Sequence, residues 1–175
     1  MGDLPTRIEY SDGKEFKFGD TTIKFSQPVF HGTNPRLGYV TEVLVIDEND
    51  GYRFIHTSDV EGPSVEEQIN FILQNKPNVV FLDGPLSYML GFRYSNASLK
   101  ISLENMVKII KKCPIESLVV DHHFLRDLKW KDRLSNVFEV AEKEEVKLQT
   151  AAEFAGKKIE MLEALRKELY ARYHV

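Results

Sequence analysis

Apolar and polar residues alternate with a period of two through the first third of the chain, and turn residues interrupt the alternation every few positions. The apolar members of this pattern are Ile8, Tyr10, Phe16, Phe18, Ile23 and Phe25. Because successive side chains of a strand point to opposite faces, this spacing predicts short antiparallel strands. Further strands are expected at residues 40–46 and 52–57, on either side of a loop that ends in Asp50-Gly51.

The spacing becomes helical after residue 60. Ser64 and Glu67 have the spacing of a capping box, and apolar residues follow at intervals of three and four. Two more helices are expected at residues 103–110 and 125–141. A last helix is expected to begin at a second capping box, Thr150 with Glu153, and to carry one apolar stripe as far as Leu169. Three short apolar runs are typical of strands: residues 78–82, 117–120 and 146–148.

The chain begins with a β-rich segment, residues 7–58, and continues with alternating strands and helices, residues 59–175. This order predicts an α/β (α+β) fold with a mixed sheet and helices on one face. A length of 175 residues suits a single domain, residues 1–175. The other face of the sheet must also be covered. The last helix can cover it, or a second half of a sandwich that lies outside this chain.

Composition narrows the classes of function. No apolar run is long enough to cross a bilayer, so no membrane partner is expected. Cys113 is the only cysteine, which excludes an internal disulfide and a cysteine-cluster zinc site and suits a reducing cytoplasm. The net charge of -4 gives no overall attraction to nucleic acid.

Acidic and imidazole side chains stand where the apolar runs end. They are His31, Asp59, Asp83, Asp121, His122 and His123. Sites in α/β proteins collect at the carboxyl ends of strands, and imidazole and carboxylate groups are ligands of divalent metals. For each residue taken alone, a hydrogen-bonded structural histidine or a capping aspartate is the competing interpretation.

Other residues are expected to support such a site. Asp83 or Asp121 would accept a hydrogen bond from the second ring nitrogen of a ligand histidine, unless Asp121 caps the following helix. His123 and Arg126 are supporting candidates as well. The aromatic segment 86–96 is expected either to form a loop over the site or to pack in the interior. His56 is expected to be structural and His174 to be exposed to solvent.

The order of these residues resembles the later metal-binding motifs of the metallo-β-lactamase superfamily. His31 lies in Pro-Val-Phe-His-Gly, Asp59 ends a hairpin in His-Thr-Ser-Asp, and His122 follows a strand-terminal Asp121. The strings HTSDVEGP, FLDGP and VVDHHFLRD resemble an archaeal, uncharacterised branch of that superfamily over residues 8–170. The resemblance implies the C-terminal half of an αββα sandwich.

By this resemblance His31 would bind one metal ion, Asp59 would bridge two, and His122 would bind the second. The implied cofactor is zinc, one or two ions, which would activate water for attack on an ester, amide or phosphodiester. The family's His-x-His-x-Asp-His signature has no counterpart before His31. The resemblance therefore implies a missing N-terminal half in cis or a partner chain in trans, and an isolated chain that binds metal weakly and is inactive.

Two alternatives stay open. The chain can be a degenerate relative or a non-catalytic interaction module whose β-rich half presents an apolar face to another protein or to a second copy. It can also be a DHH-type phosphoesterase, because Asp121-His122-His123 resembles the motif that names that family. Those enzymes open with an Asp-x-Asp strand end, however, and this chain offers only Asp12 and Asp20 in turns.

Overall fold

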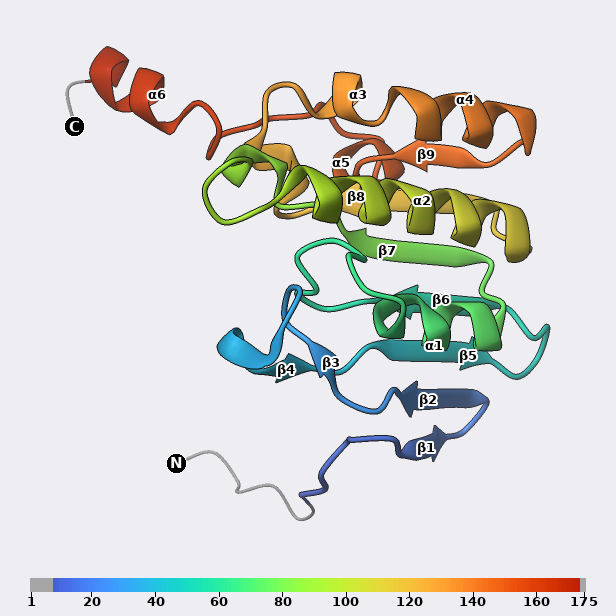
Figure 1. Ribbon diagram of the computed structural model, residues 1–175. Coiled ribbons are helices and arrows are strands. Elements are labelled where there is room, and N and C mark those ends of the chain that lie inside the picture. The colour runs from blue at the N-terminus through green and yellow to red at the C-terminus, as the bar shows by residue number, and fades with distance from the viewer. Residues whose placement is uncertain (1–7, 174–175) are drawn as a thin grey trace.

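The computed structural model describes residues 8–173. Within them, seven strands form one mixed sheet in the order β1-β2-β5-β6-β7-β8-β9 (Figure 1). The strands are β1 (Glu15–Phe18), β2 (Thr21–Phe25), β5 (Val43–Asp47), β6 (Arg53–His56), β7 (Val79–Asp83), β8 (Ser117–Asp121) and β9 (Lys147–Gln149). Neighbours from β1 to β6 pair antiparallel, and those from β6 to β9 pair parallel. The predicted mixed sheet is confirmed.

A second, two-stranded antiparallel sheet joins β3 (Val29–Phe30) to β4 (Tyr39–Val40). It shortens the strand predicted at residues 40–46, because Val40 pairs with Val29 in this small sheet and β5 begins only at Val43. The first expected strand residues, Ile8 and Tyr10, are not in a strand and are exposed.

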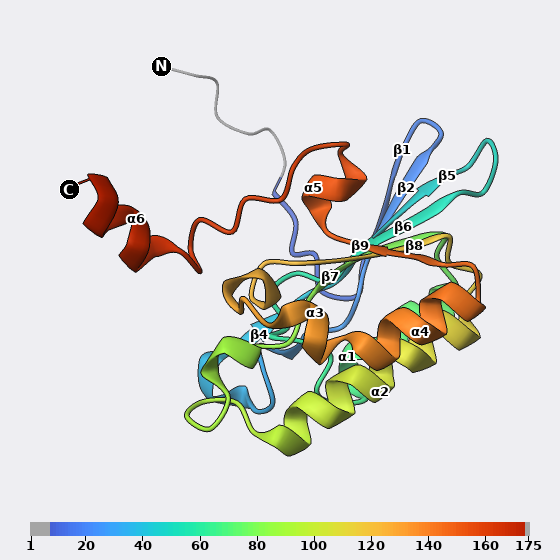
Figure 2. The same cartoon turned by 90° about the horizontal axis from the view of Figure 1, so that it is seen from above.

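Helices α1 (Glu67–Asn75), α2 (Asn96–Lys112) and α4 (Ser135–Lys143) cover one face of the large sheet, and α5 (Ala151–Phe154) lies on the other face (Figure 2). The remaining helical segments are η1 (Pro35–Leu37), η2 (Ser87–Met89), η3 (Phe124–Arg126), α3 (Trp130–Arg133) and α6 (Arg166–Tyr173). In both views α6 extends away from the sheet. No helix among the described residues is long and apolar enough to cross a membrane.

The core fills the space between the sheet and its three covering helices. Alternate strand residues contribute to it, as the period of two requires. Its fully buried members include Leu44, Ile55, Ile69, Ile72, Val80, Met106, Ile109, Leu118 and Val137. Burying one such side chain stabilises the fold by roughly 1.5–3 kcal/mol. The core therefore fixes the register of β5 to β8, and with it the positions at which those strands end.

The opposite face of the sheet is covered only in part. Phe54, Phe81 and Phe154 of α5 form an aromatic row, with ring centroids 5.2 and 5.1 Å apart. Over β1 and β2 the apolar side chains instead line an open groove of about 420 Å³. Its apolar lining residues are Phe16, Phe18, Ile23 and Phe25.

The capping box predicted at Ser64 and Glu67 is wrong. Helix α1 begins at Glu67 without a side-chain cap, and Ser64 Oγ lies 2.5 Å from the Tyr94 hydroxyl. Gln68 accepts a hydrogen bond from Val65 N instead (3.1 Å). A long-range contact to Tyr94 has thus replaced the local bond that the spacing suggested.

Two predicted helices are interrupted. The helix expected at residues 125–141 is divided into η3, α3 and α4, and Asp127 holds the first break because its carboxylate accepts from Lys129 N (2.9 Å) and Ser87 Oγ (2.7 Å). The capping box at Thr150 and Glu153 is confirmed, but its helix ends at Phe154. Gly156 follows in a left-handed conformation (φ 66°), which ends the helix.

Candidate metal centre

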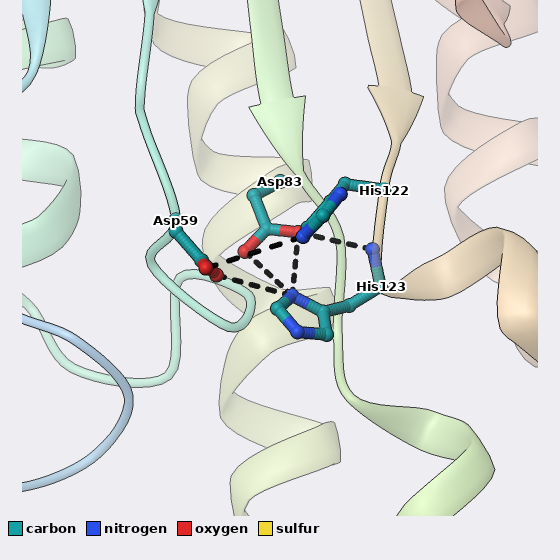
Figure 3. Close-up of side chains that lie close together, drawn as sticks. All are labelled: Asp59, Asp83, His122 and His123. Carbon is teal, nitrogen blue, oxygen red and sulfur yellow. Dashed lines mark hydrogen bonds and ion pairs between the residues drawn. The ribbon is translucent and has the colours of Figure 1, made fainter. Parts of the chain in front are cut away.

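The parallel strands bring the candidate ligands to one edge of the sheet. Asp83 is the last residue of β7, His122 and His123 follow β8, and Asp59 lies in the loop after β6. Since parallel strands end on the same side, these four side chains converge (Figure 3). One ligand atom from each lies within 4.8 Å of the others. The geometry is that of a site able to hold a divalent cation.

His123 and Asp83 form the buried side of this cluster. His123 Nδ1 lies 3.0 and 3.1 Å from the two carboxylate oxygens of Asp83 and 3.2 Å from Asp59 Oδ1. Asp83 also accepts from the backbone N–H groups of His123 (3.2 Å) and Glu61 (2.7 Å). The carboxylate of Asp83 therefore fastens the loop after β6 to the segment after β8.

His31 joins the cluster from the small sheet, and His122 joins it from the exposed side. His31 Nε2 is 3.3 Å from Asp59 Oδ1, whereas His122 Nε2 is 4.0 Å from Asp59 Oδ2. Asp59 thus presents one oxygen to His31 and His123 and the other to His122. Of the three residues assigned as metal ligands from the sequence, Asp59 and His122 belong to the group of four, and His31 contacts that group through Asp59.

Two buried atoms of the cluster, His31 Nε2 and Asp59 Oδ1, face each other at 3.3 Å but form no hydrogen bond among the described residues. A buried polar atom left in this way costs about 1–3 kcal/mol. A cation would satisfy both atoms. Zinc–ligand bonds of about 2.0–2.2 Å imply tetrahedral ligand–ligand separations of roughly 3.3–3.6 Å. The 3.3 Å from His31 to Asp59 falls in that range, and the 4.0 Å from His122 to Asp59 exceeds it. The chemistry of the donor set fits such an ion.

The pKa values of the buried pair are both raised. Burial raises the pKa of Asp83, and its hydrogen bond and attraction to His123 offset only part of that effect. Burial alone would lower the pKa of His123, but the hydrogen bond to Asp83 and the charges of Asp83 and Asp59 raise it. The pair consequently binds protons at a higher pH than the isolated side chains would.

The loops around the cluster hold unusual backbone conformations. Ser58, Glu61 and His122 have φ values of 60°, 52° and 60°, in the left-handed region that side chains with a Cβ seldom occupy. Each of them makes a short hydrogen bond: Ser58 Oγ donates to Thr41 O (2.6 Å), and the backbone N–H groups of Glu61 and His122 donate to aspartate side chains (both 2.7 Å). Backbone strain at such positions is typical of functional sites.

Gln68 of α1 positions the two loops that carry His31 and Asp59. Its buried side-chain amide lies within hydrogen-bonding distance of three carbonyls, those of Phe30 (3.0 Å), Gly32 (2.8 Å) and Val60 (3.0 Å). The small sheet is thereby fastened to the loop after β6. The spacing of the sequence assigned Gln68 no role beyond its place in a helix.

Asp121 and Arg126 lie beside the cluster without contacting the ligand rings. The Asp121 carboxylate accepts from the backbone N–H groups of His122 (2.7 Å) and Ala151 (3.1 Å), so it binds the start of α5. Of the two aspartates considered for fixing a histidine ring, Asp83 is the one that reaches one. Arg126 Nη1 donates to the Tyr88 hydroxyl (3.2 Å), and the Tyr88 ring stacks on His123 at 6.5 Å. Through Tyr88, the aromatic segment does lie over the cluster.

Glu61 is a site residue that the sequence did not single out. Its carboxylate is buried, 3.7 Å from His31 Nε2 and 3.4 Å from Arg93 Nη2. Gly32 permits this approach, because a Cβ there would lie 2.7 Å from Glu61 Oε2. The signal available was the acidic residue two positions after Asp59. His56 Nδ1 accepts from Ser58 N (3.1 Å), and the structural role expected for His56 stays a prediction. His174 lies outside the described residues.

Fold and site together define an α/β protein with histidine and aspartate side chains gathered at the carboxyl ends of its parallel strands. The chain is similar to proteins named UPF0282 protein from three archaea: it is 51% identical over 168 residues to that of Korarchaeum cryptofilum, 47% over 169 to that of Metallosphaera sedula and 44% over 172 to that of Sulfurisphaera tokodaii. No family model matches the chain.

These alignments cover 96%, 97% and 98% of this chain but 55%, 54% and 55% of the relatives. The chain therefore spans about half the length of the curated relatives it matches. The expected likeness to archaeal proteins is confirmed. The assignment to the metallo-β-lactamase superfamily is wrong, since these relatives carry the name UPF0282 protein and no metallo-β-lactamase name, and no family model supports it.

Proposed function

We propose that this chain contributes the ligands of a divalent-metal centre to a metal-dependent hydrolase, with zinc as the ion. The observation that carries the proposal is that His31 and His122 lie on either side of Asp59, 3.3 and 4.0 Å from its two oxygens, while Asp83 and His123 lie with Asp59 and His122 in one group within 4.8 Å. Neutral imidazole nitrogens and carboxylate oxygens are the ligands that a catalytic zinc ion takes in proteins.

In this proposal His31, Asp59 and His122 bind metal. Asp59 divides its two oxygens between His31 on one side and His122 on the other, which is the arrangement that a bridging carboxylate needs. His123 and Asp83 orient Asp59 from the buried side. Ligand orientation by hydrogen-bonded neighbours typically changes metal affinity by 10-fold to 100-fold.

A bound zinc ion supplies a coordinated water of lowered pKa and an electrophile for a carbonyl or phosphoryl oxygen. The chain's own residues orient the ligands and supply a proton. The His123 ring, held by Asp83 through Nδ1 at 3.0 Å, lies beside the cluster and is placed to give a proton to the leaving group of an ester, an amide or a phosphodiester.

We further propose that residues outside these 175 complete the centre, from the rest of a longer protein or from a partner chain. The relatives are almost twice as long as the aligned segment, which supports this. The chain alone would then bind zinc weakly and would not catalyse. The cytoplasmic location expected from the single cysteine stays a prediction.

Zinc titration against a competing chelator tests the centre. We expect His31→Ala and Asp59→Ala each to weaken binding by about tenfold or more. Asp132→Asn, which removes an exposed aspartate of α3, serves as the matched control and should leave binding unchanged. Unchanged zinc affinity in Asp59→Ala would contradict the centre. Tight binding of two ions together with hydrolysis by the chain alone would contradict the need for further ligands.

A second candidate function is a non-catalytic interaction module. The open apolar groove over β1 and β2 favours it, because large apolar patches on a surface mark binding sites. Light scattering discriminates between the interaction module and the hydrolase by measuring the mass of the associated species. In the interaction module, Phe18→Ser would weaken association through the groove and leave zinc binding unchanged. The DHH-type phosphoesterase stays an untested prediction, and here Asp121 is engaged by backbone donors.

A further inference from the structure

A cavity of about 540 Å³ adjoins the metal cluster and shares His31 and Glu61 with it. Its other lining residues come from the loop after His31 and from the aromatic segment before α2. They are Thr33, Asn34, Arg36, Leu37, Phe92 and Arg93. A molecule bound in this cavity would contact His31, whose Nε2 is 3.3 Å from the central aspartate. The cavity is thus placed to hold a substrate beside the metal cluster.

The polar groups of the cavity are mostly hydrogen-bond donors. Arg36 and Arg93 bring two positive charges, and Glu61 is the only acid among the residues that line it. The Glu61 contact at 3.4 Å occupies one of the five N–H donors of the Arg93 guanidinium. The two arginines therefore offer N–H donors and positive charge to a molecule in the cavity. Such donors can bind an anionic group.

The apolar lining of the cavity is Leu37 and Phe92, and both side chains are exposed to solvent. Phe92 is 83% exposed, in the segment that connects η2 to α2. An exposed phenylalanine beside two arginines offers a planar surface on which a base can stack, next to donors for its phosphate. Together these groups match a nucleotide more closely than a simple anion.

We infer that this cavity is a phosphate-binding subsite and that the substrate is a phosphoester that carries a planar base. The inference rests on the proposed hydrolase function and narrows its substrate class. An ester or amide bond is itself uncharged, whereas a phosphoester brings an anion for the two arginines together with the bond to be hydrolysed at the metal centre. Arg36 and Arg93 are binding residues in this scheme, with the guanidinium forks matched to phosphate oxygens.

Calorimetric titration of the metal-free chain with adenosine monophosphate and with inorganic phosphate tests the subsite without any activity. We expect Arg36→Ala and Arg93→Ala each to lower the affinity for both ligands by about tenfold. Phe92→Ala should lower the affinity for adenosine monophosphate by about tenfold and leave the affinity for inorganic phosphate unchanged. Arg172→Ala, in α6, is the matched control. Equal affinities in Arg36→Ala and in the unmodified chain would overturn the subsite.

Because Arg93 contacts Glu61, Arg93→Lys provides a second variant that keeps the charge and loses the fork. It should weaken phosphate binding while preserving the thermal unfolding midpoint. With the full-length protein and zinc, Arg36→Ala should slow hydrolysis of bis(p-nitrophenyl) phosphate and spare p-nitrophenyl acetate. Equal slowing of both substrates would overturn the subsite.

The two proposals fail in different ways. Zinc binding with no effect of either arginine on phosphate affinity would refute the subsite and leave the metal centre standing. Phosphate binding that depends on both arginines, in a protein that binds no zinc, would support the subsite and refute the hydrolase.

Discussion

Glu42 provides a test of the fold that is independent of any metal. Its side chain is fully buried, and neither carboxylate oxygen has a hydrogen-bond partner among the described residues. Its backbone is fixed by two hydrogen bonds of 2.9 Å with Ser26. Two residues later, Leu44 belongs to the core, and the strand period places both side chains on the same face. Burial therefore raises the pKa of Glu42 well above its ordinary value of 4.5.

The sign of the effect on stability follows from proton linkage. Above pH 4.5 the unfolded chain loses the Glu42 proton, whereas the folded chain keeps it until the raised pKa is reached. The folded state therefore binds more protons over that window, and the free energy of unfolding falls as pH rises, by about 1.4 kcal/mol per pH unit. Below the window this contribution to stability is fully present.

Glu42→Gln replaces the acid with a neutral group of similar shape and should remove this slope. We expect urea unfolding of the metal-free chain, followed by circular dichroism, to give similar stabilities for both proteins near the acid end of the window. At higher pH the variant should become more stable than the unmodified chain, by about 1.4 kcal/mol per pH unit within the window. Glu139→Gln makes the same change of charge at an exposed position of α4 and controls for net charge. A stability difference between Glu42→Gln and the unmodified chain that does not change with pH would refute the reasoning.

Three further predictions concern the site and its loops. In a chelator competition, His122→Ala should reduce zinc affinity more than 100-fold, because it removes a ligand. His123→Ala, which removes an orienting residue, should reduce it only 10-fold to 100-fold. The reverse order would make His123 the ligand and His122 the orienting residue. Gly32→Ala should lower the free energy of unfolding by about 1–3 kcal/mol, because the residue has φ 86° and its new Cβ would meet Glu61; an unchanged urea midpoint would refute this. Asp127→Ala removes the acceptor of the Ser87 hydroxyl, so amide exchange in residues 85–94 should accelerate while α2 stays protected, and uniform acceleration would show global destabilisation instead.

The sequence predicted those parts of the fold that depend on local pattern. The apolar runs that became β7 and β8 are buried on both sides, and such runs read as strands whatever surrounds them. Once those strands are parallel, Asp83 and His122 must lie at one edge of the sheet. The part of the cluster formed by Asp83 and His122 was therefore within reach of sequence reasoning, because it depends on strand ends and not on side-chain packing.

What the sequence did not show depends on contacts between distant segments. The start of α1 moved because Ser64 contacts Tyr94, 30 positions away. The break before α3 depends on Asp127, which contacts Ser87 at a separation of 40 residues. Glu42 carried no visible signal either, since a lone acid beside apolar residues is most often exposed. Each of these features follows from a polar group whose partner, or lack of one, is decided only in the folded chain.

The same distinction explains how the ligands of the cluster are held in place. His31 arrives from the small sheet and Asp59 from a strained loop, so neither is held by the register of the large sheet. Two buried side chains hold these loops instead and serve as anchors. The Gln68 amide donates to backbone carbonyls of both loops, and the Asp83 carboxylate accepts from a backbone N–H of the loop that carries Asp59. These anchors keep the ligand atoms 3.0–4.0 Å apart in spite of the repulsion between Asp59 and Asp83. In a site preorganised in this way, the conformational entropy of the loops is lost on folding. Binding of a metal or a phosphate then needs no further ordering of these loops, which raises the affinity.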